Sequence, residues 1–241
     1  MEDVTGIWRR IGDVPAAFAH IIRTAGLRIV GLAGAPGSGK STIANDVIRE
    51  LGPNALLLSQ DDFYYSKLER AERGFSWRGP PGSHDLPALI DVLDRIRDNK
   101  SPLIVPRYSP ELDDRIEPKV VQEVPGHVLL EGWVMGHRSE GYEEILDRLD
   151  LLVFIDVDEA VAKLRRFARE AKLRSSGAGF SADEMRRFWK EVLEPGLSRW
   201  VSDAKADADL VIALDASGRL RSAHTKSAVV MAALGRADSA N

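Results

Sequence analysis

A glycine-rich stretch lies between an apolar run and a segment of helical character, and it limits the possible folds more than any other part of the chain. It runs from Gly31 to Val47 and reads "GLAGAPGSGKSTIANDV". Within it, Gly34–Ser41 matches the pattern G-x-x-x-x-G-K-[ST], in the strand-then-helix context that this pattern requires. Such a loop turns backbone N–H groups toward phosphate oxygens, because glycine allows close approach and unusual dihedral angles. The stretch therefore predicts a phosphate-binding loop, or P-loop, within an α/β fold.

The residues of this loop have distinct expected roles. Lys40 is expected to reach the β- and γ-phosphates of a nucleoside triphosphate, and the Ser41 hydroxyl is expected to bind Mg²⁺. The helix that begins near Lys40 adds the positive end of its dipole. We therefore predict that the chain binds ATP with Mg²⁺. The loop residues expected to contact the nucleotide are Gly34, Ala35, Pro36, Gly37, Ser38, Gly39, Lys40, Ser41 and Thr42.

Short apolar runs alternate with amphipathic segments through the rest of the chain. Because these runs are continuously apolar, they are typical of parallel strands that helices cover on both faces. We predict one domain over residues 1–241, a three-layer P-loop sandwich around a five-stranded parallel sheet, with an N-terminal helical extension (1–26) and a helical lid (about 160–180). The expected strands are 27–33, 54–59, 126–132, 149–157 and 208–214. The expected helices are 7–26, 41–51, 85–99, 143–150, 159–174, 181–204 and 227–234, and the remaining long irregular stretch is 66–85.

Acidic side chains follow two of the other expected strands. Asp61 and Asp62 come after the second strand, and Glu131 closes the third. Ligands bind outside the carboxyl ends of parallel strands, so these acids should meet the P-loop at one edge of the sheet. Phosphoryl transfer to an alcohol needs a carboxylate base, a bridging Mg²⁺ and cations. Asp61 is the candidate base, Lys40 the candidate phosphate clamp, and Ser41, Glu131 and Asp61 are the candidate magnesium ligands; a helix cap or solvated turn is the alternative for the two aspartates.

Composition and the lack of other motifs narrow the class of protein. The formal net charge of −4 argues against a nonspecific nucleic-acid binder, and a chain without cysteine excludes thiolate metal sites and cysteine nucleophiles. No apolar run approaches the roughly 18 residues that span a bilayer. The N-terminus lacks the apolar core of a secretory signal, so we expect a cytoplasmic protein with neither membrane nor nucleic-acid partners. Residues 99–102 are the nearest approach to the N-K-x-D motif of GTPases, and they lack the acid. A P-loop ATPase or nucleotide-binding regulator is the alternative from another class.

Four motifs together resemble the phosphoribulokinase/uridine kinase family of P-loop kinases: "GxxGSGKST", "LSQDDFY", "PRY" and "LLEGW". Within this family, the stretches most similar to D-glycerate 3-kinases are "RGPPGSHDLPAL" (78–89), "LLEGWVMG" (129–136) and "GFSADEMRRFWKEVLEPGLSRWV" (179–201). The resemblance, over about residues 27–215, implies an ATP- and Mg²⁺-dependent kinase that phosphorylates a hydroxyl of a small metabolite. D-glycerate is the first candidate for the acceptor, and uridine, pantothenate or a sugar are the alternatives. The segment "SPELDDRIEP" (109–118) departs from the family pattern, because it is shorter and acidic.

An acceptor that carries a carboxylate should be bound by cations, and arginine binds a carboxylate through two parallel hydrogen bonds. The cations available for this purpose are Arg78, His84, Arg107 and Arg115. Asp85 fits a helix cap and a substrate contact equally well. Tyr64 and Tyr108 line the acceptor pocket in one interpretation and only pack in the other. The residues expected to bind the acceptor are Asp62, Tyr64, Arg78, His84, Asp85, Arg107 and Tyr108.

The segment 163–174, "KLRRFAREAKLR", carries six basic residues and one acid. A solvated basic helix is one interpretation. The other is a lid that closes arginines onto the triphosphate, with Arg165 and Arg169 in contact with the nucleotide and "SSGAG" (175–179) as the hinge. The adenine base is expected near the loop after the last strand, at Asp215–Gly218.

Overall fold

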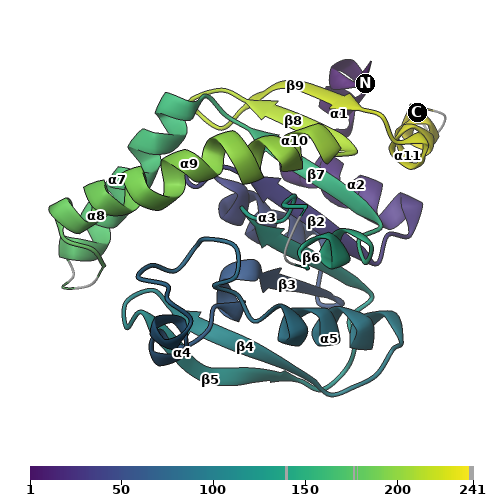
Figure 1. Ribbon diagram of the computed structural model, residues 1–241. Coiled ribbons are helices and arrows are strands. Elements are labelled where there is room, and N and C mark those ends of the chain that lie inside the picture. Colours follow the sequence, from purple (N-terminus) through teal and green to yellow (C-terminus); the bar gives the residue numbers. More distant parts are fainter. Residues whose placement is uncertain (139–140, 176, 178, 239–241) are drawn as a thin grey trace.

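A seven-stranded sheet forms the middle layer of the computed structural model, which describes residues 1–138, 141–175, 177 and 179–238 (Figure 1). Its strands are β1 (Glu2–Asp3), β2 (Ile29–Gly34), β3 (Ala55–Ser59), β6 (His127–Gly132), β7 (Leu151–Asp156), β8 (Leu210–Leu214) and β9 (Leu220–Thr225), in the order β1-β9-β8-β7-β2-β6-β3. The five strands from β8 to β3 are parallel, as predicted. The prediction of a sheet with five strands was nevertheless incomplete, because β9 and β1 extend the β8 edge in antiparallel orientation. Both are short, β1 is exposed and β9 is only partly buried, so no continuous apolar run marks them.

The register of the sheet brings the carboxyl ends of three strands to the same level. β2 is buried along its whole length and lies between β6 and β7. Its Leu32 is paired with Glu131 of β6, and Glu131 is paired on its other side with Ser59 of β3. The P-loop leaves β2 two residues later. The sheet therefore delivers a carboxylate and a hydroxyl to the edge from which the P-loop departs.

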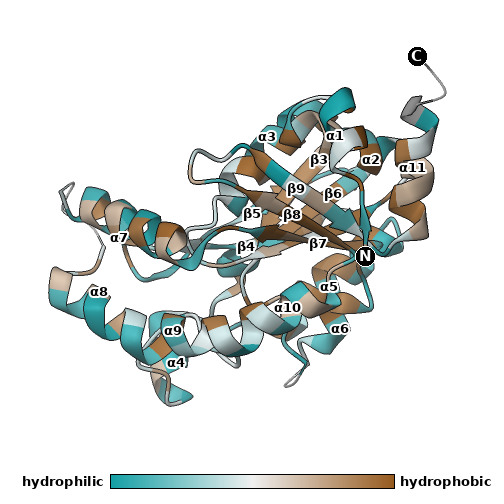
Figure 2. Cartoon of the chain, turned by 90° about the horizontal axis from the view of Figure 1, so that it is seen from above, coloured by the Kyte–Doolittle hydropathy of each residue, from teal (hydrophilic) through white to brown (hydrophobic). Residues whose placement is uncertain are grey.

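Helices cover both faces of the sheet, and Figure 2 shows the apolar strands between the two helical layers. One layer contains α1 (Thr5–Ile11), α2 (Val14–Ala25), α3 (Lys40–Leu51) and α11 (Ala228–Asp238). The other contains α5 (Leu86–Arg97), α6 (Glu143–Leu146) and a helical rod described below. No helix in the described part of the chain is both long and apolar enough to cross a membrane.

The N-terminal extension forms two helices where one was predicted over 7–26. Gly12 ends α1, and the Asp13 side chain caps α2 by accepting a hydrogen bond from the Ala16 N–H at 3.0 Å. Pro15 then occupies the first turn of α2, where its missing N–H has no cost. The extension contributes Trp8 and Phe18, both fully buried, to the core beneath the sheet. It is therefore part of the helical layer rather than an appendage.

A helical arm projects beyond the sheet at the P-loop end (Figure 1). It consists of α7 (Glu159–Ser175) and the first part of a rod that runs back across the sheet. The rod corresponds to the predicted helix 181–204. It consists of α8 (Ala182–Phe188), α9 (Glu194–Gly196) and α10 (Ser202–Asp207), which are joined by π-helical turns at Trp189–Leu193 and Leu197–Val201.

A two-stranded hairpin packs below the main sheet and was not predicted. Its strands are β4 (Leu103–Ser109) and β5 (Asp114–Val121), and much of β5 is exposed. The expected irregular stretch 66–85 also contains a short helix, α4 (Lys67–Glu72), which Ser66 and Glu69 cap reciprocally. Both elements lack a long apolar pattern, because they cover only a small part of the core.

Candidate active site

The P-loop has the local geometry that its glycines predict. Gly37 and Gly39 have φ angles of 90° and 94°, values that only glycine adopts easily, and Gly39 is the residue that precedes α3. A Cβ atom at Gly37 would lie 2.1 Å from the Ala162 carbonyl oxygen of α7. The first turns of α7 are thus packed directly on the P-loop. Any closing motion must come from the outer part of the arm.

A cavity of about 300 Å³ opens between the P-loop, the strand ends and the arm. This size is at the low end for ligand sites in proteins. The predicted site residues that line it are Pro36, Gly37, Gly39, Lys40, Ser41, Thr42, Asp61, Tyr64, Arg78, Glu131, Arg165 and Arg169. Its other walls are Pro110, Trp133, Arg166, Glu170, Leu173, Phe188 and Leu193. The structure therefore brings most of the residues predicted to bind the nucleotide, and two of those predicted to bind the acceptor, to one place. Gly34, Ala35 and Ser38 do not line this cavity.

Glu131 lies at the floor of the cavity and is largely buried. Its carboxylate accepts hydrogen bonds from the Ser41 hydroxyl at 3.2 Å and from the Ser59 hydroxyl at 2.9 Å. A carboxylate and a hydroxyl are the oxygen ligands that Mg²⁺ takes from a protein when phosphates and water supply the rest. The described residues contain no cluster of three or more acidic or histidine side chains that could bind a metal alone. The donor set thus fits a magnesium ion that arrives with a nucleotide. Ser59 was missed by the sequence analysis, although it ends a strand.

Asp61 lies in a 3₁₀ turn (Gln60–Phe63) directly after β3 and is exposed to the cavity. Its carboxylate accepts a hydrogen bond from the Tyr64 hydroxyl at 3.0 Å. The Trp133 ring N–H lies 3.4 Å from the same hydroxyl and donates to it. Burial raises the pKa of Tyr64 well above its ordinary value, so the hydroxyl stays protonated and remains a donor to Asp61. The pair of aromatic side chains therefore fixes one oxygen of Asp61 and leaves the other free.

Arg78 faces the cavity from the acceptor side. Its guanidinium donates to the Asp113 carboxylate at 2.6 Å, and Asp113 also accepts from the Tyr108 hydroxyl at 2.5 Å. Burial opposes the charge on Arg78, but the neighbouring Tyr108 and Asp113 raise its pKa, so the side chain is a fixed cation. Asp113 itself occupies the turn between β4 and β5 with a φ angle of 53°. Asp113 was not among the predicted site residues, since it lies in the segment that departs from the family pattern.

Five residues expected to bind the acceptor do not line this cavity. His84 is buried behind Tyr64, with its ring stacked at 4.2 Å and its Nδ1 atom 2.6 Å from the Tyr142 hydroxyl. Burial lowers the pKa of His84 to about 4, so the ring is neutral. Asp85 caps α5 through the Ala88 N–H and is paired with Arg115 at 2.8 Å, which supports the cap interpretation. The other three expected contacts are displaced for separate reasons.

Asp62 accepts a hydrogen bond from the Tyr108 N–H at 3.1 Å and joins the 3₁₀ turn to β4. Burial raises the pKa of Asp62 above its ordinary value. Tyr108 packs against Tyr64 edge to face at 5.3 Å, and Arg107 points from β4 into solvent. Since the hairpin was not predicted, the alternation of its side chains between inside and outside could not be assigned.

The basic helix α7 was expected to direct Arg165 and Arg169 at the nucleotide, but Arg165 is bound to backbone carbonyl groups instead. Arg165 donates hydrogen bonds to the carbonyl oxygens of Ser38, at 3.4 Å, and Ala216, at 3.1 Å. Arg169 lines the cavity, as does Arg166, which the sequence analysis did not single out. The predicted hinge at 175–179 includes residues 176 and 178, which lie outside the described residues.

A second cavity of about 570 Å³ begins on the other side of Arg165. It is lined by Ser217 and Gly218, close to the position expected for adenine, and shares Gly39 and Thr42 with the first cavity. Residues 13–15 of the N-terminal extension form another part of its wall. The two cavities together trace a path from the end of β8, over the P-loop, to Asp61.

Comparison with known proteins identifies the family of the chain. The model of the phosphoribulokinase/uridine kinase family matches residues 29–217. A uridine kinase of Lactobacillus johnsonii is 27% identical over 188 residues, which cover 76% of this chain and 85% of the relative. A uridine kinase of Staphylococcus aureus is 28% identical over 196 residues, with coverages of 76% and 86%.

Two solved structures share the fold. A D-glycerate 3-kinase of Cryptococcus neoformans superposes with a TM-score of 0.71 at 18% identity, covering 89% of this chain and 99% of that one. A phosphoribulokinase of Rhodobacter spheroides gives a TM-score of 0.56 at 13% identity, with coverages of 79% and 71%. The chain belongs to the phosphoribulokinase/uridine kinase family and is an ATP-dependent kinase that phosphorylates a hydroxyl group.

Proposed function

We propose that this kinase transfers the γ-phosphoryl group of ATP, bound with Mg²⁺, to a hydroxyl of D-glycerate. The observation that carries the proposal is the position of Arg78, a fixed cation that lines the same small cavity as Asp61. An acceptor with a carboxylate at one end and hydroxyls at the other could bind to both side chains at once. The cavity of about 300 Å³ favours such a short acceptor over a bulky one.

On the donor side, the P-loop backbone, Lys40 and Thr42 would bind the triphosphate, with Arg166 and Arg169 facing it from the arm. The adenine base would occupy the second cavity beside Ser217 and Gly218. Ser41 and Glu131 would bind Mg²⁺ directly or through water, and the ion would neutralise charge on the β- and γ-phosphates.

On the acceptor side, Asp61 would accept the proton of the attacking hydroxyl as its oxygen forms a bond to the γ-phosphorus. The bond between that phosphorus and the β–γ bridging oxygen breaks at the same time, and ADP leaves. The hydrogen bond from Tyr64 holds one oxygen of Asp61 and would leave the other for the proton of the hydroxyl. Trp133, Phe188 and Leu193 would exclude water, which otherwise competes as the acceptor.

Uridine is the second candidate, because the sequence relatives described above are named uridine kinases. A nucleoside acceptor carries no carboxylate, so Arg78 would have no charged partner in it. The aromatic side chain that is hydrogen-bonded to Asp61 is Tyr64, which is already stacked on His84 and is 3% exposed. This geometry offers less surface for a pyrimidine ring than it offers Arg78 for a carboxylate.

A release assay for ADP tests the proposal directly. Purified protein with ATP and Mg²⁺ would be given D-glycerate, L-glycerate, uridine, pantothenate and ribulose 5-phosphate in separate reactions. We expect kcat/KM to be at least about tenfold higher for D-glycerate than for uridine, because only D-glycerate carries a carboxylate that can bind Arg78. A higher kcat/KM for uridine would replace D-glycerate with the second candidate. ADP release that is independent of every acceptor would instead indicate an ATPase.

A further inference from the structure

Glu170 is a buried carboxylate in the wall of the active-site cavity, and no step of the proposed reaction uses it. It lies on α7 and is 1% exposed. One carboxylate oxygen accepts a hydrogen bond from the Arg166 guanidinium, and the other accepts from the Phe180 backbone N–H at 2.6 Å. Burial works against a charged carboxylate, but these two hydrogen bonds hold the pKa of Glu170 below its usual range. A buried charge with both oxygens engaged is a fixed support for the groups that bind to it.

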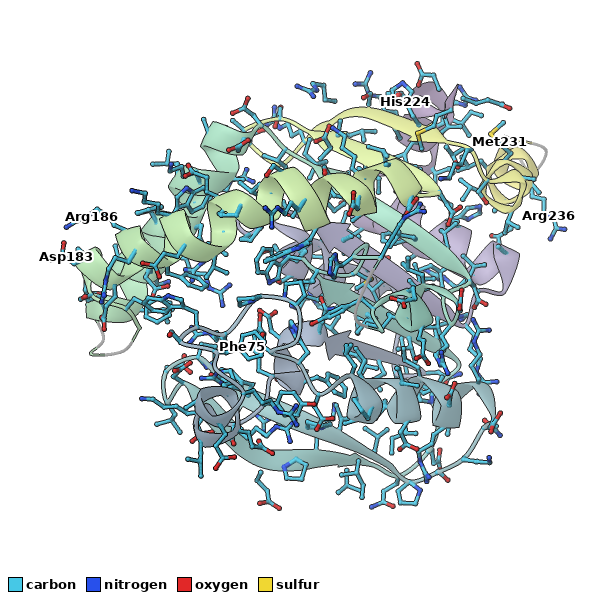
Figure 3. The ribbon with its side chains drawn as sticks, in the orientation of Figure 1. Phe75, Asp183, Arg186, His224, Met231 and Arg236 are labelled. Carbon is cyan, nitrogen blue, oxygen red and sulfur yellow. The ribbon has the colours of Figure 1, made fainter. Side chains whose placement is uncertain are left out.

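Arg166 is the first group that Glu170 supports. It lines the cavity together with Lys40, one helical turn from the carboxylate. Burial lowers the pKa of Arg166, and the hydrogen bond and charge of Glu170 oppose this shift. A second arginine–carboxylate pair on the arm shows the contrast. Asp183 and Arg186 are paired at the outer end of α8, where both are largely exposed (Figure 3). An exposed pair of that kind contributes little, whereas removing one partner of a buried pair is costly.

Phe180 is the second group. Its N–H binds Glu170 and its carbonyl oxygen accepts from Arg174, so α7 fixes both ends of its backbone. The Arg78 guanidinium lies over the Phe180 ring, 4.9 Å from its centre. The chain also passes close to Glu170 at Gly179. A Cβ atom on Gly179 would lie 2.4 Å from a carboxylate oxygen of Glu170.

We propose that Glu170 is a positioning residue for both substrates: it directs Arg166 toward the γ-phosphate of ATP and, through Phe180, it supports Arg78 on the acceptor side. The inference rests on the proposed function, since it takes Arg166 as a phosphate contact and Arg78 as an acceptor contact. One carboxylate thereby joins the two halves of the site across the cavity.

Nucleotide binding tests the first half without any acceptor. ATP and ADP would be titrated, each with Mg²⁺, into the wild type, Glu170→Gln and the control Asp183→Asn. In Glu170→Gln an amide replaces the partner of Arg166, and we expect the preference for ATP over ADP to fall about tenfold, the loss typical of one hydrogen bond to a charged group. Asp183→Asn breaks the exposed pair and should keep the wild-type ratio. A lower melting temperature in Glu170→Gln with an unchanged ratio would overturn the proposal.

Steady-state kinetics test the second half, with the acceptor that has the highest kcat/KM in the panel above. In Glu170→Gln the carboxylate partner of Arg166 is lost, so kcat should fall. The amide still keeps an oxygen for the Phe180 N–H, so the acceptor KM should stay within about twofold. Glu170→Ala loses both contacts, so the acceptor KM should also rise about tenfold. Equal acceptor KM values in the two variants would exclude the route through Phe180.

A pair of glycine variants tests the same contact without changing the carboxylate. Gly179→Ala places a methyl group against Glu170, and Gly177→Ala places one in open space at a similar φ angle of 82°. We expect Gly179→Ala, but not Gly177→Ala, to reproduce the loss of ATP preference. Identical ATP-to-ADP ratios in both variants would contradict the proposal. Because the binding assays need only nucleotide, a wrong acceptor leaves them intact, whereas a wild type that binds no ATP would overturn the proposed function itself.

Discussion

The two walls of the active-site cavity are held in place by different interactions. The donor wall is made of backbone that the central strands position, with Gly37 packed on Ala162 and Glu131 fixed by two serines. The acceptor wall is made of side chains on a loop and a hairpin, held by ion pairs and ring contacts around Asp113 and Tyr64. The first arrangement tolerates few substitutions, while the second can change without disturbing the sheet. A family can therefore keep one donor site and vary its acceptors.

Removal of the proposed base should have the largest effect. Asp61→Asn keeps an oxygen for the Tyr64 hydroxyl but cannot accept a proton, so kcat should fall about 10²- to 10⁴-fold with little change in ATP affinity. The matched control is Asp62→Asn, whose amide oxygen can still accept from the Tyr108 N–H. Single-turnover kinetics and nucleotide titration measure both quantities. Comparable losses in the two variants would remove Asp61 as the base.

A methyl group on the donor wall should weaken nucleotide binding next most strongly. Gly37→Ala forces a Cβ against the Ala162 carbonyl at a φ angle of 90°, and strain of this kind costs about 1–3 kcal/mol, or about 5- to 150-fold in the Kd for ATP. Gly52→Ala, at the other end of α3, has a φ angle of 85° and open space around the position. The control should lose some stability but bind ATP normally. Calorimetric titration checks the difference, and an unchanged Kd in Gly37→Ala would show that the donor wall can adapt.

The acceptor wall should respond through KM. Arg78→Lys keeps the charge but loses the planar pair of donors, so we expect the KM for D-glycerate to rise about 10- to 30-fold while the KM for ATP stays the same. Arg107→Lys is the control, because Arg107 is exposed on β4 outside the cavity. Initial-rate measurements with each substrate varied in turn give both values. Equal effects of the two substitutions would show that the carboxylate does not bind at Arg78.

Acid should destabilise the acceptor side through His84, and this is the smallest expected effect. The pKa of this ring is about 4 in the folded chain against 6.5 in the unfolded chain, so the unfolded state takes up the proton first as the pH falls. The free energy of unfolding should therefore drop between pH 7 and pH 5, by on the order of 2 kcal/mol. Urea unfolding at both pH values measures the drop. His84→Gln should lose this part of the pH dependence, and the control His20→Gln should keep it; the same slope in all three proteins would refute the assignment.

The parts that the sequence predicted share one physical property: a strong local signal. The P-loop glycines, the buried strands and the acids at their ends each follow from a short stretch of residues, and the structure brings Lys40, Asp61 and Glu131 to one cavity. The five parallel strands were predicted for the same reason. The helix predicted from residue 181 begins there as well, where Ser181 and Glu184 form a capping box at the start of α8.

The parts that were missed depend on burial or on distant partners. Arg166 resembles its basic neighbours in sequence, and only its burial beside Glu170 distinguishes it. The segment 109–118 appears merely acidic until the hairpin turn places Asp113 between two arginines. His84 lies in a motif that suggests a substrate contact, yet stacking on Tyr64 draws it behind the cavity. In the last two cases a charge or ring is positioned by residues far along the chain, which no local pattern encodes.

The pairing of β1 with β9 has a consequence for the order in which the chain can assemble. The Ala223 N–H donates to the Thr5 hydroxyl at 2.8 Å, across a sequence separation of 218 residues. Contacts of such long range form slowly, because a large loop must close before they can form. During synthesis, the helical layer that contains α1 and α2 can therefore complete its contacts with β9 only after nearly the whole chain has been made. The P-loop side, whose strand and helix are neighbours in sequence, can form its local structure much earlier.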